Sequence, residues 1–490
     1  MNKKMIFIII GILISYTIID AIAIGNNHEI SKISSLIPED SYQLDILNKT
    51  LSNEEFPLST AHPPIRIIGE DEFSSENGVT RGDGTKDNPY IIELLRIEAT
   101  SFWLYLNTFL NWIEQSDLDN KWEYFVNIPI CGIYLKDTAK HVIIRNNHLR
   151  NWNGESRELI QIAGITLVNA SNVTIEKNIF ENNYRGVNFE NVQRVTKEIN
   201  NSVHTFHEEY DSVFCTIKNN TFITNDNEGL FLQFLTHSEI IGNDFSGNGC
   251  GIRSNVCKVI INNNSFYSNG NGFISTQYDF STIKYNTFIS NGNAIYCSES
   301  SSSNPIGSNP LIAYNYFEGN SAGVFITTNY PNIENNTFYK NNYGIMNMGA
   351  SRLPIRIVDN NISENKWMAI SFRGACIIDH NRIVSNGEGG ISITGNVTIT
   401  NNIIALNHGH GLSISSDDRY PAVHYNNIFN NTGKGINCKP SSDLPTNATM
   451  NYWGSPDGPG GYGSGNGDEI DEFILYDPWL SEMNYQAGPR

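Results

Sequence analysis

The stretch that decides the fold is "IENNTFYKNNYGIM", residues 333–346. It sets asparagine beside single apolar residues, and asparagine disfavours helices because its side chain competes for backbone hydrogen bonds. Its frame is an aliphatic residue, two variable positions, asparagine, one variable position, and then an aromatic or aliphatic residue. The frame returns along the chain with its asparagine at Asn147, Asn178, Asn220, Asn243, Asn264, Asn286, Asn315, Asn336, Asn360, Asn381, Asn402 and Asn427, and Asn451 takes the same place before Trp453.

The repeat has a nearly fixed period. Most of the frame's asparagines are 21 to 25 residues apart, and longer steps of 31, 42 and 29 residues follow Asn147, Asn178 and Asn286. A period in this range is typical of solenoids. The leucine frame of leucine-rich repeats is missing, and so is the 3.6-residue apolar period of helical repeats. Short apolar–polar alternation rich in Val, Ile and Phe instead predicts an all-β solenoid, a single-stranded parallel β-helix of about 13 coils with three short strands per coil.

The asparagines have a structural explanation in such a coil. A sharp bend between two strands needs left-handed backbone geometry, which asparagine tolerates better than other residues except glycine. Asparagines stacked in successive coils can also hydrogen-bond one another as a ladder. We therefore predict that each repeated asparagine occupies a left-handed bend within a ladder. The apolar residues of the frame point inward in this interpretation and form one continuous core.

The chain divides into six predicted segments. Lys3 and Lys4 precede a short apolar run and then Ala21 and Ala23, a pattern that predicts a secretory signal peptide, with an uncleaved anchor as the alternative. The chain is therefore expected to be secreted or held at the cell surface. The predicted segments are a signal peptide (1–23), an N-terminal linker (24–63), an N-terminal cap (64–100), an aromatic-rich insertion (101–130), the β-helix (131–455) and a C-terminal cap (456–490).

Charge and cysteine content restrict the partners and the chemistry. Charged residues make up 17% of the chain and the formal net charge is −19, which argues against binding to nucleic acid or to an anionic membrane surface. Contact with a membrane is expected only through an uncleaved N-terminal segment. The seven cysteines show no zinc-type spacing and are expected to fill small positions as thiols, with a Cys250–Cys257 pair as the alternative.

Two end segments carry a resemblance to a known family. They are "PIRIIGEDEFSSENGVTRGDGTKDNPYIIELLRIEA", residues 64–99, and "NYWGSPDGPGGYGSGNGDEIDEFILYDPWL", residues 451–480. With the repeats between them, they resemble exported right-handed parallel β-helix proteins of the NosD-like or periplasmic copper-binding type, including those of archaeal cell surfaces. The resemblance implies a right-handed coil, capped at both ends because an open solenoid end exposes strand edges and core. For some family members it also implies copper-site maturation.

Support for a metal site is limited to one cluster. The stretch "HTFHEEYD" contains His204, His207 and Glu208, residue types that can bind a divalent ion. The alternative is a solvated polar loop. No cofactor is expected, and a divalent metal is the alternative.

An enzymatic interpretation rests on "HGHGLSISSDD", residues 408–418, which resembles the Gly-His-Gly phrase of polygalacturonase-type hydrolases. The candidate catalytic residues are His410, Glu388, Asp417 and Asp418. Inverting hydrolysis needs paired carboxylates, and the aspartate pair that this family carries on the preceding coils is missing. His410 also takes an ordinary place in the repeat, before a glycine and an apolar residue. A catalytic role is therefore uncertain, and a protein without enzymatic activity is the expectation.

A binding role is better motivated. The insertion contains Trp103, Tyr105, Trp112 and Trp122, whose rings could stack on sugars, or could pack on the coils as a lid. Asn-x-Ser/Thr sequons such as the one at Asn172 also predict a glycoprotein. The predicted function is structural or adhesive, with carbohydrate binding, and the partner is an extracellular glycan or cell-surface component. The alternatives are a polysaccharide lyase or hydrolase and an accessory protein for a copper site.

Overall fold

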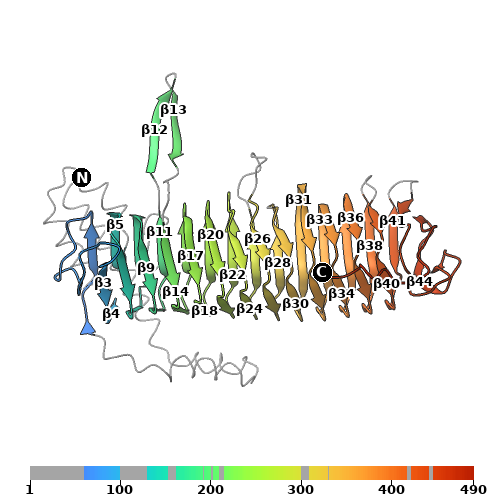
Figure 1. Ribbon diagram of the computed structural model, residues 1–490, viewed down its shortest axis with the longest axis horizontal. Coiled ribbons are helices and arrows are strands. Elements are labelled where there is room, and N and C mark those ends of the chain that lie inside the picture. The colour runs from blue at the N-terminus through green and yellow to red at the C-terminus, as the bar shows by residue number, and fades with distance from the viewer. Residues whose placement is uncertain are drawn as a thin grey trace, which may run out of the picture. The chain divides into compact units, whose positions relative to one another are not determined.

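The fold is known from a computed structural model that describes residues 60–490 except 100–129, 153–161, 191–192, 200–201, 209–213, 299–307, 329, 417–420 and 441–444. The described residues belong to one compact unit, Leu58–Arg490. They form a right-handed parallel β-helix, as predicted, with three strands in each coil (Figure 1). The predicted signal peptide and nearly all of the predicted aromatic-rich insertion lie outside the described residues.

The strands of successive coils fall into three parallel stacks, numbered by their order within each coil from β2 onward. The first stack contains β2 (Ile65–Ile68), β5 (Ile130–Thr138), β8 (Ile162–Ala170), β11 (Arg185–Glu190), β16 (Glu228–Gln233), β19 (Cys250–Asn255), β22 (Asn271–Thr276), β25 (Asn293–Cys297), β28 (Ala322–Ile326), β31 (Tyr343–Val358), β33 (Met368–Asp379), β35 (Gly389–Thr394), β38 (His410–Ser416), β41 (Ile436–Pro440) and β44 (Gly467–Ile470). The second contains β3 (Tyr90–Glu93), β6 (Val142–Arg145), β9 (Val173–Glu176), β14 (Cys215–Lys218), β17 (Thr236–Ile241), β20 (Lys258–Asn262), β23 (Thr282–Lys284), β26 (Leu311–Ala313), β29 (Asn332–Glu334), β36 (Val397–Thr400), β39 (Ala422–His424), β42 (Thr446–Asn447) and β45 (Ile474–Leu475). β31 and β33 continue from the first stack into the second.

The third stack is the most regular, with 14 strands in chain order. It contains β1 (Thr60–Ala61), β4 (Leu95–Glu98), β7 (His148–Arg150), β10 (Ile179–Glu181), β15 (Thr221–Ile223), β18 (Asp244–Ser246), β21 (Ser265–Tyr267), β24 (Thr287–Ile289), β27 (Tyr316–Glu318), β30 (Thr337–Tyr339), β32 (Asn361–Ser363), β34 (Arg382–Val384), β37 (Ile403–Ala405) and β40 (Asn427–Phe429). Two elements add to the coils, an antiparallel hairpin of β12 (Gln193–Ile199) with β13 (Ser202–Glu208), and β43 (Pro459–Gly461), which pairs with β44.

The first coil begins earlier than the sequence suggested. Residues 64–100 were predicted as a cap, but β2, β3 and β4 pair in parallel with β5, β6 and β7, so this segment supplies strands to all three stacks. The loop between β2 and β3 contributes the buried Val79 and also Phe73, whose ring stacks on that of Tyr90 at the start of β3 with the centroids 4.3 Å apart. The segment therefore extends the β-helix and also packs on its first coil.

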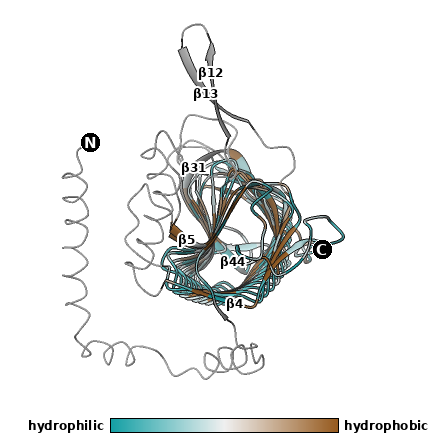
Figure 2. Cartoon of the chain, turned by 90° about the vertical axis from the view of Figure 1, so that its left-hand side faces the viewer, coloured by the Kyte–Doolittle hydropathy of each residue, from teal (hydrophilic) through white to brown (hydrophobic). Residues whose placement is uncertain are grey.

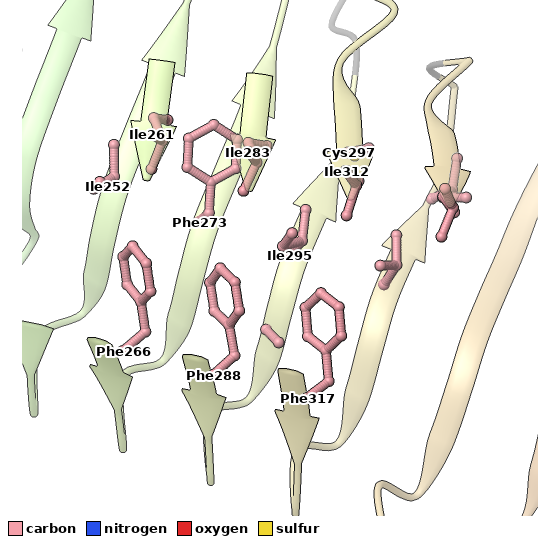
Figure 3. Packing of buried hydrophobic residues seen from close by; sticks show 14 of the residues in the cluster. Ile252, Ile261, Phe266, Phe273, Ile283, Phe288, Ile295, Cys297, Ile312 and Phe317 are labelled. Atoms are coloured by element: carbon pink, nitrogen blue, oxygen red, sulfur yellow. The ribbon is translucent and has the colours of Figure 1, made fainter. Parts of the chain in front are cut away.

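Alternating side chains build the core. The three-residue strands of the third stack mostly bury only their central residue, so each presents one side chain to the interior. Phe266, Phe288 and Phe317 are such residues, and Figure 3 shows their rings in a row inside the coils. Their centroids are 4.5 and 5.1 Å apart, in stacked pairs that each contribute about 1 kcal/mol beyond burial. Figure 2, which looks along the coils, shows apolar segments on the strands and polar segments at many corners.

The predicted asparagine ladder is present at the corner between the second and third stacks. The Nδ2 of Asn264 donates to Asn286 Oδ1 at 3.0 Å and to Ile240 O at 2.9 Å. Its Oδ1 accepts from the backbone N–H and the Nδ2 of Asn243, both at 2.9 Å. The same links join Asn147, Asn178, Asn220, Asn243, Asn264, Asn286, Asn315, Asn336, Asn360, Asn381, Asn402, Asn426 and Asn451.

Asn427, predicted as a ladder residue, is not one. Asn426 holds that place, and its Oδ1 accepts from Asn402 N at 2.9 Å. Asn427 lies one residue later in β40, opposite Ile403, and its Oδ1 accepts from Asn484 N at 2.8 Å. Only Asn426 fits the whole frame, with Val423 three positions before it and Ile428 two positions after it. Asn427 has Phe429 two positions later but His424 three positions before it.

The left-handed bend is also one residue away from its predicted place. Among the described residues, the ladder asparagines are not among those with positive φ, whereas the residues just before them are, as at Asn263 (φ 53°) and Asn335 (φ 57°). The bend residue turns the chain, and the next side chain then points inward and along the ladder. The ladder asparagine is therefore required for its hydrogen bonds and not for its backbone conformation.

A second ladder, which the sequence analysis missed, occupies the corner between the third stack and the next first-stack strand. Each member lies five residues after a member of the first ladder, as Asn269 follows Asn264. The ladder begins where Asn183 Oδ1 accepts from Trp152 N at 3.1 Å, and it ends where Asn431 Nδ2 donates to Asp468 at 2.8 Å. Its members are Asn183, Asn225, Asn248, Asn269, Asn291, Asn320, Asn341, Asn365, Asn386, Asn407 and Asn431.

All seven cysteines are buried free thiols, including Cys250 and Cys257, so the alternative of a disulfide between these two is not realised. Burial raises the pKa of Cys215 and of Cys257 to about 12. They are small core residues, as predicted. The part of the chain that the structure describes contains no helix long and apolar enough to cross a membrane.

Candidate functional site

A groove of about 720 Å³ lies on the second stack of the described residues. It runs across the coils of β9, β14, β17, β20 and β23, on their outward faces. Its lining combines exposed apolar side chains with hydroxyl, amide, imidazole and charged groups. The lining residues are His141, Asn172, Val173, Thr174, Phe214, Cys215, Thr216, His237, Ser238, Glu239, Lys258, Val259, Ile260, Phe280 and Thr282.

Strand register explains why these residues meet. One column along the groove consists of outward residues paired from coil to coil, Thr174, Thr216, Glu239, Ile260 and Thr282. A second column consists of the residues two positions before those of the first column, with His141 at the corresponding place before β6: His141, Asn172, Phe214, His237, Lys258 and Phe280. Residues about 22 positions apart in sequence are thus neighbours in the groove, because successive strands of a stack lie about 4.8 Å apart.

A β-bulge re-aims one side chain of the second column. The register between β17 and β20 shifts between Thr236 and Glu239, because β17 carries one extra residue there. His237 takes a left-handed conformation (φ 53°) and is exposed. Its ring lies 5.7 Å from that of Phe214. Bulges often occur beside functional sites because they redirect a side chain.

The bulge is held from inside by Ser238. Its hydroxyl accepts from Cys215 N at 3.0 Å and donates to Thr236 O at 3.1 Å, and the residue is buried. The Ser238 side chain thus compensates for the broken strand pairing at the bulge. The position of His237 is therefore fixed by the core and does not depend on a mobile loop.

Phe280 is held at the groove by a buried carboxyl group beside it. Asp279 Oδ1 accepts from Ser281 N at 3.1 Å and also from the Ser281 hydroxyl, while Asp279 N donates to Ser308 Oγ at 3.0 Å. Phe280 N donates to Cys257 O at 2.8 Å. Because its backbone neighbours are fixed, the Phe280 ring is presented to solvent, with 40% of the residue exposed.

The buried position of Asp279 makes stability depend on pH. Desolvation raises the pKa of Asp279 from 3.8 to about 6. The folded protein therefore keeps a proton that the unfolded chain releases between pH 4 and 6, and the free energy of unfolding falls as pH rises through this window. The expected loss from this group is roughly 3 kcal/mol, complete above pH 6.

Asp279→Asn should remove this dependence. Unfolding measured at pH 4 and pH 7 should show a variant that gains stability relative to the wild type as pH rises. Other carboxylates change the stability in the opposite direction, and the comparison with the wild type removes their contribution because both proteins contain them. Asp379 is one of these: burial raises its pKa, but hydrogen bonds from Thr400 and His380 outweigh burial and lower the pKa. A constant difference between the two proteins at both pH values would show that Asp279 ionises normally in the folded state.

The groove offers recognition groups and little sign of a reactive centre. Among the described residues that line the groove, Glu239 and Lys258 are the only charged ones, so this described lining has no formal net charge with its two histidines neutral. The Cys215 thiol is buried and its raised pKa keeps it protonated at neutral pH, which excludes it as a nucleophile. Exposed rings and mixed polar groups around a shallow groove are typical of a binding surface.

The structure separates the predicted catalytic residues from this groove. His410 begins β38 in the first stack, and its Nδ1 accepts from Lys434 N at 2.9 Å, so one ring nitrogen serves the coil structure. Glu388 is exposed at the turn that enters β35. Asp417 and Asp418 lie outside the described residues, so the catalytic hypothesis stays a prediction.

The other predicted sites fall largely outside the described side chains. Trp103, Tyr105, Trp112 and Trp122 all lie outside the described residues. The backbone of His204, His207 and Glu208 belongs to β13, where His204 pairs with Lys197 and His207 with Arg194, and their side chains are not described. Neither hypothesis is tested by the fold.

Comparison with known proteins identifies the class. Residues 205–356 and 350–452, together just over half of the chain, match the family "Right handed beta helix region". Residues 112–258 match "Periplasmic copper-binding protein (NosD)". The chain therefore belongs to the right-handed β-helix family, and its residues 112–258 are similar to NosD proteins.

Solved structures are also similar to the chain, among them the two that follow, whereas no curated protein matches it. The crystal structure of the periplasmic alginate epimerase AlgG has 12% identity and a TM-score of 0.37, and the match covers 72% of this chain and 82% of that one. A mutant of the same enzyme gives 11% identity and a TM-score of 0.35 over the same shares.

The copper-binding name of one matching family raises the question of a metal. Among the described side chains, no group of three or more His, Cys, Asp or Glu lies close enough to hold an ion. The cysteines, the soft ligands that copper(I) prefers, are dispersed through the core as protonated thiols. The described residues therefore do not fit a copper centre.

Proposed function

We propose that this protein is an exported β-helix protein that binds a neutral, extended carbohydrate in the groove on its second stack, in a structural or adhesive role. The observation that carries the proposal is the pair of exposed phenylalanines, Phe214 and Phe280, fixed at the rim of a groove of about 720 Å³. Export is supported by the names of the matched proteins, which are periplasmic, and by the predicted signal peptide.

The aromatic rings supply the apolar half of sugar recognition. Phe214 is 53% exposed although it lies beside the first core residue of β14, and Ile260 in the same groove is 46% exposed. Solvent-exposed rings of this kind are unfavourable in isolation and are typical of surfaces that meet a partner. The C–H faces of a sugar ring can pack on them.

The polar groups supply the other half. Thr174, Thr216 and Thr282 present hydroxyl groups in register along the groove, and Glu239 and Lys258 can bond sugar hydroxyls. The lining has no net charge, and the chain carries −19, so a polyuronate would meet neither a cationic groove nor an attractive field. This charge balance favours a neutral glycan.

Replacing Phe214 and Phe280 with alanine should weaken glycan binding about tenfold to hundredfold, since each ring contributes about 1 kcal/mol or slightly more. A glycan array with neutral and uronate-rich chains identifies the ligand, and calorimetry gives the affinities. Phe473→Ala is the matched control, because Phe473 is 38% exposed in the C-terminal segment and outside the groove. Equal affinities of the double variant and the wild type would contradict the proposal.

Incubating the protein with each glycan that it binds tests the enzymatic alternative. We expect no release of reducing ends or unsaturated products from any glycan that binds. Turnover that is lost in His410→Ala would favour the hydrolase interpretation of the "HGHG" stretch. Turnover lost in Glu239→Gln would instead make the groove an active site.

A further inference from the structure

Two tyrosines next to the groove occupy positions that the fold does not favour for them. Tyr285 and Tyr314 are the left-handed bend residues before Asn286 and Asn315, both with φ 56°. Left-handed geometry is unfavourable for a bulky residue, and neighbouring coils place Asn263 and Asn335 at the same corner. The tyrosines are 54% and 46% exposed. Tyr425 shares this backbone geometry (φ 60°) and exposure, so what points to a ligand is the pairing of Tyr285 with Tyr314 beside the groove and not the strain alone.

The two rings form a platform with its own depression. Their centroids are 5.3 Å apart and their planes differ by 19°. A depression of about 410 Å³ beside them is also lined by Tyr316, Asn335 and Thr337. In the coils on either side of this pair, the bend residues are Asn263 and Asn335. The outer face of each tyrosine ring therefore has no aromatic bend residue beside it.

The same corner already accommodates an extended chain farther along the coils. Asn484 N donates to Asn427 Oδ1 at 2.8 Å, Asn484 Nδ2 donates to Tyr425 O at 2.7 Å, and Gly488 N donates to Asn401 O at 2.9 Å. Arg490 then reaches Asp359, 3.5 Å away. The C-terminal residues thus follow the corner as far as the Asp359 coil, and Asn335 and Tyr314 occupy it in the next two coils.

The platform is continuous with the groove. Thr282, which lines the groove, begins β23, and Tyr285 follows the last residue of that strand, so the two are about 10 Å apart. Lys284 lies between them with its ammonium 5.9 Å from the Tyr314 ring centre. A ligand that leaves the groove past Phe280 meets Lys284 and then the tyrosines.

We propose that Tyr285 and Tyr314 form a distal subsite of the glycan path, so that the preferred ligand is a neutral oligosaccharide longer than a disaccharide. This inference rests on the proposed function. The groove binds one end of the oligosaccharide through Phe214 and Phe280. The tyrosine platform binds the sugar units about 10 Å farther along the oligosaccharide. The protein is therefore selective for the length of the glycan, because a short sugar occupies only the groove and does not reach the tyrosines.

The test compares a disaccharide with a hexasaccharide of the neutral glycan that the array identifies. The variant is Tyr285→Asn with Tyr314→Asn, since asparagine is the residue of the neighbouring coils and tolerates the same backbone. We expect the hexasaccharide to bind about tenfold more weakly to the variant, with unchanged affinity for the disaccharide. Tyr425→Asn, at the same kind of corner and 46% exposed, is the control and should change neither.

Two results would overturn the subsite. Unchanged hexasaccharide affinity would show that the tyrosines touch no sugar, and an equal loss for both lengths would show an indirect effect on the groove. If the wild type binds neither sugar, the proposed function itself fails and the subsite fails with it. A wild type that binds both sugars with equal affinity would refute the subsite alone.

Discussion

Replacing Asn336 with leucine should lower the free energy of unfolding by about 3–5 kcal/mol, since it leaves several buried polar groups without partners. The Asn336 side chain takes part in five hydrogen bonds. Its Oδ1 accepts from the N–H and the Nδ2 of Asn315, and its Nδ2 donates to Ile312 O, Glu334 O and Asn360 Oδ1. Leucine can replace none of these, and no water reaches a residue that is 1% exposed.

Asn332→Leu in the same coil is the control. The amide of Asn332 makes one exposed hydrogen bond, at 3.2 Å to Asn309, so its replacement should cost less than about 0.5 kcal/mol. Denaturant unfolding of both variants gives the comparison. Similar midpoints for the two would mean that the ladder hydrogen bonds contribute nothing beyond those of a surface asparagine.

Deleting residues 451–490 should leave a chain that aggregates end to end. The segment covers the last coil through Trp453, which is fully buried, and through the pairing of Ile436 with Ile470 and of Thr446 with Ile474. It also ends both ladders, with Asn451 on Asn426. Its removal exposes parallel strand edges and the core, and unpaired edges recruit further strands.

Deleting only residues 481–490 is the matched control for the cap. This removes the contacts of Asn484 and Arg490 along the corner but keeps Trp453 and β43–β45, so the protein should stay monomeric. Size-exclusion chromatography with light scattering distinguishes the two truncations. A monodisperse monomer after the longer deletion would show that the segment does not protect the end of the solenoid.

The fold could be predicted because its determinants repeat. An asparagine that must link to the next coil returns at every coil, and an apolar residue such as Phe288 or Phe338 follows two positions later. The errors each displaced a feature by one residue. Asn427 was assigned the ladder place because Phe429 follows it by two positions, although only Asn426 has an aliphatic residue, Val423, three positions before it. The left-handed residue directly precedes the asparagine that was expected to be left-handed.

The site could not be predicted in the same way. Phe214, His237 and Phe280 are far apart in sequence and meet only through strand register, which an extra residue in β17 also changes locally. The available signal was an aromatic side chain where alternation calls for a polar one. Such a signal is weak in one coil and gains weight only when coils are aligned. The predicted aromatic residues of 101–129 are a separate hypothesis that the groove does not test.

A crystal structure of the protein with the neutral oligosaccharide that it binds tests the central claim most directly. We predict sugar rings against Phe214 and Phe280, with hydroxyl groups bonded to Glu239 or Lys258 and the chain directed toward Tyr285. Sugar bound only on the first or third stack, or at the C-terminal segment, would contradict the assignment of the groove.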